Sequence, residues 1–422
     1  MMQRFDIVVA GGGPAGMAAA VSAAECGKQV AIVDDNLAPG GQIWRGKDIP
    51  ATAKEWQARV NTANVTYLQE ARIFAQPAPA MVRAEQNGNY LDIAYQKLIL
   101  ATGARERFLP FPGWTLPNVL GTGGLQALVK SGLSIEGKSV VVAGSGPLLL
   151  AVAAYLRAHG AKVLAVCEQA PFLRLLTFAT SLVTDREKLR QAIAYKLQML
   201  AVPFHTSCWP VSAQGRGKLE SVTLRKGNRT RTIVCDYLAC GFHLVPNTEL
   251  AELLGCRIAD GKVAVDEWQQ TSVLNVYCAG EPTGIGGVEL ALIEGQIAGY
   301  ASAGEQDKAR AFFHERANRR DFARKLEETF ALDPALKELA SDDTFVCRCE
   351  DVPYRALKHE DSWRAAKLHT RCGMGPCQGR ICGPATEFLF GWSTGSVRPP
   401  IFPTTLSCLG ATPELTELQE TR

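Results

Sequence analysis

The sequence has no apolar run long enough to cross a bilayer. Its longest one, residues 140–156, is interrupted by a Gly-Ser-Gly-Pro stretch that begins at Gly144, whereas a transmembrane helix needs about 20 consecutive apolar residues. The chain starts with MMQRFDIVVAGGG, which enters a strand at once and has no signal-peptide cleavage pattern. We therefore expect no transmembrane segment and a cytoplasmic location.

An excess of one charge is also missing. The 45 Lys and Arg residues and the 42 Asp and Glu residues leave a formal net charge of +3, which argues against nucleic acid as a main partner. The chain has 422 residues, of which 47% are hydrophobic and 21% are charged. Those proportions are typical of folded globular proteins, and the length fits two or three domains.

Two kinds of catalytic motif are absent from the sequence. No C-x-x-C pair lies near either of the glycine-rich loops described next, so disulfide reduction is not expected. The histidines have no metal-ligand spacing and are interpreted as structural or surface residues; they are His159, His205, His243, His314, His359 and His369. We identify no acid or base that would act on a substrate and predict no catalytic residue in this chain.

A glycine-rich loop follows the first apolar strand, residues 5–10, and precedes an Ala-rich helix pattern. In a nucleotide-binding βαβ unit the first glycine permits the tight turn, the second lets a pyrophosphate approach, and the third lets the helix pack on the strand. The helix N-terminus then favours the pyrophosphate charge. An acid 23 residues after the first glycine can bind ribose hydroxyls. The predicted contacts are Gly11, Gly13, Pro14, Ala15, Gly16 and Asp34.

A second loop of this kind follows a strand at residues 139–143, and another strand, 162–167, ends at an acid. Leu149 stands where the third glycine would be. The acid, Glu168, would bind a ribose 2′-hydroxyl and repel a 2′-phosphate, which favours NAD over NADP. An adenine mononucleotide such as ATP, or a lobe retained only for structure, are the alternatives. The predicted contacts are Gly144, Gly146 and Glu168.

The first loop and several later motifs resemble the flavoproteins with two dinucleotide-binding domains, which include enzymes like glutathione reductase and thioredoxin reductase. The further motifs are PGGQ at residues 39–42, ATG at 101–103 and YCAGE at 277–281. The resemblance implies FAD in the first lobe, with a helix that begins near residue 286 facing the flavin. The residues it implies are Gly41, Gln42, Thr102, Gly103, Gly280, Glu281, Gly287 and Val288.

These patterns predict an α/β fold with two Rossmann-like lobes and a small C-terminal α-rich domain. The FAD-binding domain is expected in two parts, residues 1–125 and 242–304, around a second nucleotide-binding domain at 126–241. A charged helical linker is expected at 305–344, with its arginines on a solvated helix face or, alternatively, on a surface for an acidic partner. A metal-binding domain with a Pro-rich extension is expected at 345–422.

Thirteen cysteines are unevenly distributed along the chain. Seven are scattered over residues 1–344 and are interpreted as buried free thiols. The other six lie in the last 78 residues, a density that favours metal ligation in a cytosolic protein. Four thiolates can hold one [2Fe–2S] cluster. A zinc ion or a metal-free tail are the alternatives. The ligands we favour, spaced C-x-C and C-x4-C, are Cys347, Cys349, Cys377 and Cys382.

The segment CRCEDV…TRCGMGPCQGRICGP resembles the [2Fe–2S] domain of bacterioferritin-associated-ferredoxin type, as in anaerobic glycerol-3-phosphate dehydrogenase. Because the position of Cys372 need not be cysteine in that family, we interpret Cys372 as an extra thiol. Five cysteines nevertheless compete for four ligand positions, and Cys372 replacing Cys377 or Cys382 stays an alternative.

Together, the two lobes and the cysteine-rich tail resemble the larger flavin subunits of opine oxidases, hydrogen cyanide synthase and D-hydroxyproline dehydrogenase. The resemblance implies an electron-transferring α subunit with FAD and [2Fe–2S]. A β subunit like D-amino-acid oxidase would oxidise C–N to C=N, a small ferredoxin-like γ subunit is a further partner, and FMN lies between subunits in some relatives. A self-contained NADH-dependent acceptor reductase and an iron–sulfur carrier with relic nucleotide sites are the alternative functions.

Overall fold

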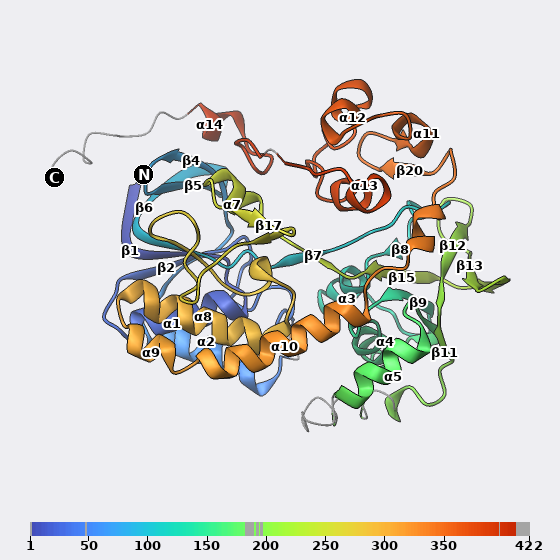
Figure 1. The fold of residues 1–422 in the computed structure, drawn as a ribbon, viewed down its shortest axis with the longest axis horizontal. Helices are drawn as coiled ribbons and strands as arrows, with labels where there is room; N and C mark the ends of the chain where they lie inside the picture. The colour runs from blue at the N-terminus through green and yellow to red at the C-terminus, as the bar shows by residue number, and fades with distance from the viewer. Residues whose placement is uncertain are drawn as a thin grey trace. The chain divides into compact units, whose positions relative to one another are not determined.

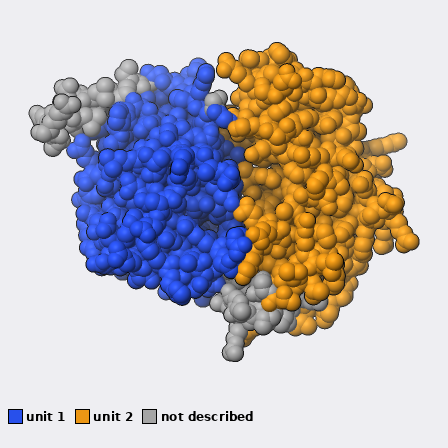
Figure 2. Space-filling model, in the orientation of Figure 1, with its two compact units in different colours: residues 1–105, 246–324, 395–422 blue, residues 106–245, 325–394 orange. Residues whose placement is uncertain are grey.

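The computed structural model describes residues 2–46, 49–181, 190, 194, 197–395 and 397–410. The chain forms two compact units (Figure 2). Unit 1 contains residues 1–105, 246–324 and 395–422, and unit 2 contains residues 106–245 and 325–394. The predicted α/β class with two nucleotide-binding-type lobes is confirmed, while the finer division at 125, 241, 304 and 344 stays a prediction.

Unit 1 is built on a seven-stranded sheet in the order β3-β2-β1-β6-β5-β4, with β19 paired to β6 (Figure 1). The strands β3, β2, β1, β6 and β19 pair in parallel, and β4, β5 and β6 pair antiparallel. The bounds are β1 (Met2–Ala10), β2 (Val30–Val33), β3 (Thr66–Leu68), β4 (Ala71–Ala78), β5 (Met81–Gln86), β6 (Asn89–Leu100) and β19 (Val276–Cys278).

The apolar run of β1 is continuous because both faces of the strand are buried. Ile7 and Val9 pack into the cluster that contains helix α1 (Pro14–Ala24), whereas Val8 and Ala10 pack into the cluster on the other face. This arrangement confirms the strand and helix predicted around the first glycine loop.

Helix α8 (Gly287–Ala303) packs closely on α1. A Cβ atom on Gly295 would lie 2.2 Å from the carbonyl oxygen of Ala15, so the two helix backbones approach more closely than larger residues allow. The other elements of unit 1 are α2 (Ala51–Thr62), α7 (Glu249–Leu253), β17 (Ile258–Ala259), β18 (Lys262–Val263), η2 (Glu281–Thr283), α9 (Gln306–Arg310) and α14 (Leu406–Leu409); α10 (Phe313–Thr329) begins in it.

Residues 397–410 belong to unit 1. Ile401 is buried, and its backbone N–H donates to the carbonyl oxygen of Phe74 on β4 at 2.8 Å. The Pro-rich extension expected near the C-terminus therefore packs on the sheet as far as it is described, and the part of that extension from residue 411 on lies outside the described residues.

Unit 2 contains a five-stranded sheet in the order β11-β10-β9-β15-β8 and a three-stranded antiparallel sheet, β12-β13-β14. The β9 and β10 strands coincide with the two strands predicted around the second loop. The bounds are β8 (Val119–Leu120), α3 (Thr122–Lys130), β9 (Ser139–Ser145), α4 (Leu148–Ala158), β10 (Lys162–Glu168), α5 (Phe172–Ser181), β11 (Phe204–Thr206), β12 (Cys208–Gln214), β13 (Ser221–Lys226), β14 (Arg229–Val234) and β15 (Tyr237–Phe242). A short pair, β7 (Ala104–Glu106) and β16 (Leu244–Pro246), completes the nucleotide-binding part.

The cysteine-rich segment folds around its own small core, which includes Val346, Leu357, Trp363 and Trp392. It follows η3 (Pro334–Glu338), a short 3-10 helix that opens with a proline. Its elements are β20 (Phe345–Cys347), β21 (Val352–Pro353), α11 (Tyr354–Leu357), α12 (Trp363–Thr370) and α13 (Cys382–Phe390). Over the whole described part of the chain, no helix is long and apolar enough to span a membrane.

Candidate functional site

The first glycine loop makes the close contacts that a tight turn requires. Gly11 has a φ of +110°, and a Cβ atom there would lie 2.3 Å from the carbonyl oxygen of Ala101. A Cβ on Gly16 would lie 1.8 Å from the carbonyl oxygen of Gly11. Gly13, in contrast, has no heavy atom within 4 Å of its Cβ position. The turn and the helix contact thus need glycine, and the space beside Gly13 is open to a ligand.

Helix α1 begins with Pro14 and Ala15, and no side chain caps it. Its first turn contains no acidic residue, so the backbone N–H groups at this end retain their attraction for an anion. A pyrophosphate is the anion that a dinucleotide would place here.

Asp34 is 7% exposed and binds the loop itself. Its carboxylate accepts from the backbone N–H of Gly12 and, at 2.7 Å, from that of Asn36. Burial raises the pKa of Asp34, and these hydrogen bonds oppose that rise. The structure therefore places Asp34 at the predicted loop, where its carboxylate holds the loop through these hydrogen bonds and can still accept further ones.

Three further loops meet the first one in unit 1. The backbone N–H of Gly40 donates to the carbonyl oxygen of Gly12 at 2.8 Å, and a Cβ on Gly41 would lie 3.0 Å from the Cα of Gly13. A Cβ on Gly280 would lie 2.7 Å from that of Ala15. The structure thus brings the loops after β1, β2, β6 and β19 together at the carboxyl edge of the parallel strands, which is where such sheets bind ligands.

The remaining predicted positions of unit 1 border the same edge. Thr102 donates from its hydroxyl to the carbonyl oxygen of Asn247 at 2.7 Å, and the backbone N–H of Asn247 donates to the carbonyl oxygen of Gly103 at 3.0 Å. Gln42 is exposed. Gly287 and Val288 open helix α8, which has no side-chain cap. The first turn of α8 also contains Glu289, and the expectation that this helix end faces a flavin stays a prediction.

Glu281 is an acceptor without a protein partner. Burial raises the pKa of its carboxyl group, and none of the described residues donates a hydrogen bond to it. Glu281 is only partly buried, and a partly desolvated carboxylate without a donor gains when a ligand supplies one. Hydroxyl groups of a ribityl chain would meet that need, so the residues present fit a flavin dinucleotide.

A buried network that sequence reasoning missed supports this loop. Glu294 is 1% exposed and accepts from the backbone N–H of Gly280 at 3.1 Å and from the hydroxyl of Thr283 at 2.8 Å. Arg320 on α10 contacts its other oxygen at 2.7 Å. The interpretation of the α10 arginines as a solvated face is wrong for Arg316, which is only 7% exposed, whereas Arg320 is 41% exposed and pairs with Glu294. No local signal marks a pair 26 residues apart.

The second glycine loop has similar geometry but is bound by its own chain. Gly144 has a φ of +136°, and its Cβ would lie 1.8 Å from the carbonyl oxygen of Gly241. Glu168 is 2% exposed and accepts from the backbone N–H groups of Gly146 at 2.8 Å and Ala170 at 2.9 Å. Burial raises the pKa of Glu168 to about 7. Its carboxylate is thus engaged by backbone groups on both oxygens.

A later segment of unit 2 binds next to this loop. The hydroxyl of Ser145 donates to the carbonyl oxygen of Phe330 at 3.2 Å. Gln169 donates to the carbonyl oxygen of Ala331 at 3.2 Å and accepts from the backbone N–H of Asp333 at 3.0 Å. The polar groups that a bound nucleotide would contact are therefore hydrogen-bonded to the chain itself, which favours a structural role for this loop.

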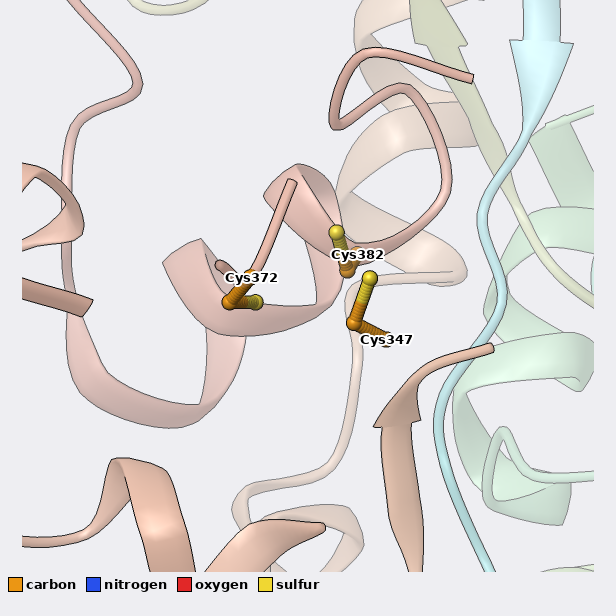
Figure 3. Close-up of side chains that lie close together, drawn as sticks. All are labelled: Cys347, Cys372 and Cys382. Carbon is orange, nitrogen blue, oxygen red and sulfur yellow. The ribbon is translucent and has the colours of Figure 1, made fainter. Parts of the chain in front are cut away.

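Three of the five candidate cysteine ligands form a buried group (Figure 3). The Sγ atoms of Cys347, Cys372 and Cys382 all lie within 4.8 Å of one another, and their side chains point together from β20, the turn after α12 and the start of α13. The thiols of Cys372 and Cys382 donate hydrogen bonds to Cys347, which lowers the pKa of Cys347 to about 2. The group thus favours negative charge on Cys347, while the hydrogen bonds to Cys347 raise the pKa of Cys372 and Cys382.

The other two candidates form a second, more accessible group. Cys349 is exposed and Cys377 is partly buried. The sulfur of Cys349 accepts from the backbone N–H of Cys377, and the two thiols contact each other. Neither joins the trio within 4.8 Å. Cys408 belongs to unit 1, where its sulfur lies 3.6 Å from the carbonyl oxygen of Gly88.

Glycines shape the segment around these thiols. A Cβ on Gly373 would lie 2.5 Å from the Trp363 ring, and one on Gly375 would lie 2.3 Å from the Cβ of Cys349. The backbone N–H of Gly373 also donates to the sulfur of Cys347. The glycines thus let the chain wrap closely enough for backbone donors to reach sulfur.

Comparison with known proteins identifies the family to which the chain belongs. The model of the pyridine nucleotide-disulphide oxidoreductase family matches residues 5–299. The chain belongs to this family. It is therefore an oxidoreductase of a flavin-dependent family, and the match spans both glycine loops.

Relatives are similar over nearly the whole chain. Hydrogen cyanide synthase subunit HcnB of Pseudomonas aeruginosa is 31% identical, over 89% of this chain and 90% of the relative. An opine oxidase subunit of Rhizobium meliloti is 30% identical, over 96% of this chain and 98% of the relative. The predicted resemblance to these two kinds of subunit is confirmed.

Solved structures with the same fold include two enzymes. L-proline dehydrogenase from P. horikoshii superposes with a TM-score of 0.67 at 18% identity, over 97% of this chain and 80% of that one. Thioredoxin reductase of T. acidophilum superposes with a TM-score of 0.56 at 20% identity, over 72% and 99%. The first likeness extends past the flavoprotein lobes into the C-terminal region.

The seven scattered cysteines meet the expectation of free thiols. Six are buried and Cys26 is partly buried, and all are free. Besides Glu294, sequence reasoning missed Glu106, whose carboxylate accepts from the backbone N–H groups of Gly123 at 2.9 Å and Gly124 at 3.0 Å at the start of α3. The only local signal for that contact was an acid shortly before a Gly-Gly helix start.

Proposed function

We propose that this chain is the FAD- and [2Fe–2S]-binding α subunit of a heteromeric amino- or imino-acid dehydrogenase of the D-hydroxyproline or opine type, located in the cytoplasm. A β subunit like D-amino-acid oxidase oxidises the substrate from C–N to C=N, the imine then hydrolyses, and this chain receives the electrons. The single observation that supports it best is near-full-length similarity to named subunits of opine oxidase and hydrogen cyanide synthase.

In this proposal FAD binds at the carboxyl edge of the unit 1 sheet. The open side of Gly13 and the uncapped start of α1 receive its pyrophosphate, and Asp34 receives its ribose. Glu281 supplies the acceptor for ribityl hydroxyls, held in place by Glu294 below the loop. Bound FAD would supply a carrier that accepts electrons in pairs and releases them singly.

The [2Fe–2S] cluster is assigned to Cys347, Cys349, Cys377 and Cys382. A single zinc ion, with Zn–S bonds of about 2.3 Å, brings its four sulfurs within about 4 Å of one another. Only three of the five candidate thiols lie within 4.8 Å of one another. A [2Fe–2S] cluster instead needs two pairs of thiolates, one pair for each iron. The inner group and the outer pair support that arrangement.

The second lobe is the weaker nucleotide site in this proposal. NAD and ATP both fit the loop sequence, but Glu168, Ser145 and Gln169 are engaged by the chain itself. We therefore assign the lobe a mainly structural part in an electron-transferring protein. A self-contained NADH-dependent reductase would need these groups to be free.

In this proposal the β subunit binds and oxidises the substrate, because we assign no residue of this chain as an acid or base acting on the substrate. The protein groups of this chain bind and orient cofactors, and the cofactors carry the redox chemistry. A small γ subunit of ferredoxin type is a further partner.

Cofactor content tests the proposal first. The full chain, purified anaerobically, should show flavin absorbance and, after reduction, an EPR signal of a [2Fe–2S] cluster. Cys382→Ser should lose the EPR signal, whereas the matched variant Cys408→Ser should keep it, since Cys408 lies in unit 1. A wild-type chain with neither group would refute the proposal.

Coexpression tests the division of labour. With a β subunit, the complex should reduce a dye with D-hydroxyproline or an opine, and the chain alone should not. Full substrate oxidation by the chain alone would contradict the proposal, and rapid bleaching of its flavin by NADH would favour the reductase alternative.

A further inference from the structure

Cys372 is a fifth thiol inside a site that needs four. It is 0% exposed, and its Sγ lies within 4.8 Å of the Sγ atoms of both Cys347 and Cys382 (Figure 3). The other members of the site are Cys349 and Cys377, which contact each other outside this trio. The structure therefore contains one more thiol on the inner side than a cluster uses.

Pairing the ligands leaves Cys372 as the surplus thiol. The segment around residue 347 gives one sulfur to the inner group and one to the outer pair, and so does the segment 377–382. Cys347 with Cys382 can thus bind one iron, and Cys349 with Cys377 the other. In this pairing each chain segment contributes one thiolate to each iron.

The position of Cys372 is fixed from both sides. The preceding residue, Arg371, adopts a φ of +66° at the end of α12, and its guanidinium contacts Glu350 at 2.7 Å. The backbone N–H of Cys372 donates to the hydroxyl of Thr370 at 3.2 Å. These contacts fasten the turn after α12 to the turn that holds Cys349, and they aim the Cys372 side chain at the inner pair.

A neutral thiol in this place is a hydrogen-bond donor to sulfur. Hydrogen bonds to ligand sulfurs stabilise the more negative, reduced form of an iron–sulfur centre and raise its reduction potential. The surroundings, which include Val346, Leu357 and Trp363, are apolar, and a hydrogen bond is electrostatically stronger in such surroundings than in water.

We propose that Cys372 is a non-ligating fifth thiol that donates its S–H to the Cys347 and Cys382 pair and raises the reduction potential of the cluster. This inference rests on the proposed function, because it takes the cluster and its four ligands from there. Cys372 is in this sense a positioning residue that acts through the ligands.

Redox titration of the full chain, purified anaerobically and followed by EPR, tests the inference. Cys372→Ala should keep its iron and its EPR signal but lose the donor. We expect its one-electron equilibrium constant to change about threefold to tenfold, a potential lower by about 30–60 mV. Cys372→Ser retains an O–H donor and should stay closer to the wild type. Cys408→Ala, another buried tail cysteine, should leave the potential unchanged.

Two results would overturn the inference. An unchanged potential in Cys372→Ala would mean that the thiol donates nothing to the cluster. Loss of iron in both Cys372→Ala and Cys372→Ser, with normal flavin content, would make Cys372 a ligand. If Cys372→Ala fails to fold, as shown by lost flavin, the reduction potential is measured on Cys372→Val instead, because valine fills the space without providing a donor. A wild-type chain without a cluster overturns the proposed function before any variant is compared.

Discussion

Arg320→Ala tests the buried network below the Gly280 loop. The change removes two hydrogen bonds to one oxygen of Glu294, at 3.0 and 2.7 Å, and one to Gln269 at 2.9 Å. Glu294 keeps two donors on its other oxygen, from Gly280 and Thr283. The variant therefore leaves a carboxylate whose side chain is 2% exposed without its countercharge.

The expected loss of stability follows from the exposure of each partner. Breaking a fully buried ion pair costs about 3–5 kcal/mol. The Arg320 side chain is 41% exposed, so solvent screens part of the interaction, and we expect about 2–3 kcal/mol. A unit of about 200 residues loses about 2–4 °C of melting temperature for each kcal/mol. The melting temperature should thus fall by about 4–12 °C.

Arg324→Ala is the matched control on the same helix. Arg324 pairs with Asp321 at 2.6 Å, with side chains 61% and 46% exposed. An exposed pair at i and i+3 of a helix contributes about 0.2–0.5 kcal/mol, so this variant should melt within about 2 °C of the wild type. Thermal unfolding followed by circular dichroism, with flavin fluorescence as a second signal, measures both. Equal melting temperatures for the two variants would refute the reasoning.

Three further predictions concern packing and charge. Gly295→Ala places a methyl group 2.2 Å from the carbonyl oxygen of Ala15 and should cost about 1–3 kcal/mol in chemical unfolding; wild-type stability would show that α1 and α8 separate easily. Ile401→Ala should cost about 2–5 kcal/mol in the same assay because Ile401 is 4% exposed, and no loss would mean that the extension does not pack on the sheet. Burial raises the pKa of Glu168 from 4.5 to about 7, so the folded state binds this proton more tightly than the unfolded state. The resulting stabilisation, at most about 3 kcal/mol, is fully present below pH 4.5 and is lost as the pH rises through 7. Glu168→Gln should flatten this dependence in unfolding measured from pH 5 to 8, and an unchanged slope would contradict it.

Local sequence patterns were sufficient for the two nucleotide-binding lobes. In each lobe, the apolar strand before the first glycine, the glycines themselves and the acid after the second strand lie within 30 residues of chain, 5–34 and 139–168. The steric requirements of turns and the periodicity of strands act over that range of sequence, so these features can be predicted without knowing the tertiary structure. The cysteine-rich tail is readable in the same way only as a set of residue types and short spacings, which predict a metal site.

The network around Glu294 shows what such patterns miss. Its partner Arg320 lies in a charged helix that the sequence presents like any solvated one. Its role arises because α10 runs past α8 after the chain has returned to unit 1. Whether two residues 26 positions apart in the chain are buried and paired depends on how the helices pack, and a short stretch of sequence does not contain that information.

By itself, the sequence determined the fold class, the two loop-and-acid motifs and the six tail cysteines, because each is encoded by neighbours along the chain. Only the tertiary structure decided which of the thiols face one another, that Cys408 belongs to unit 1, and that residues 330–333 lie against the second loop. Those outcomes depend on how distant segments pack, and packing is a property of the whole chain.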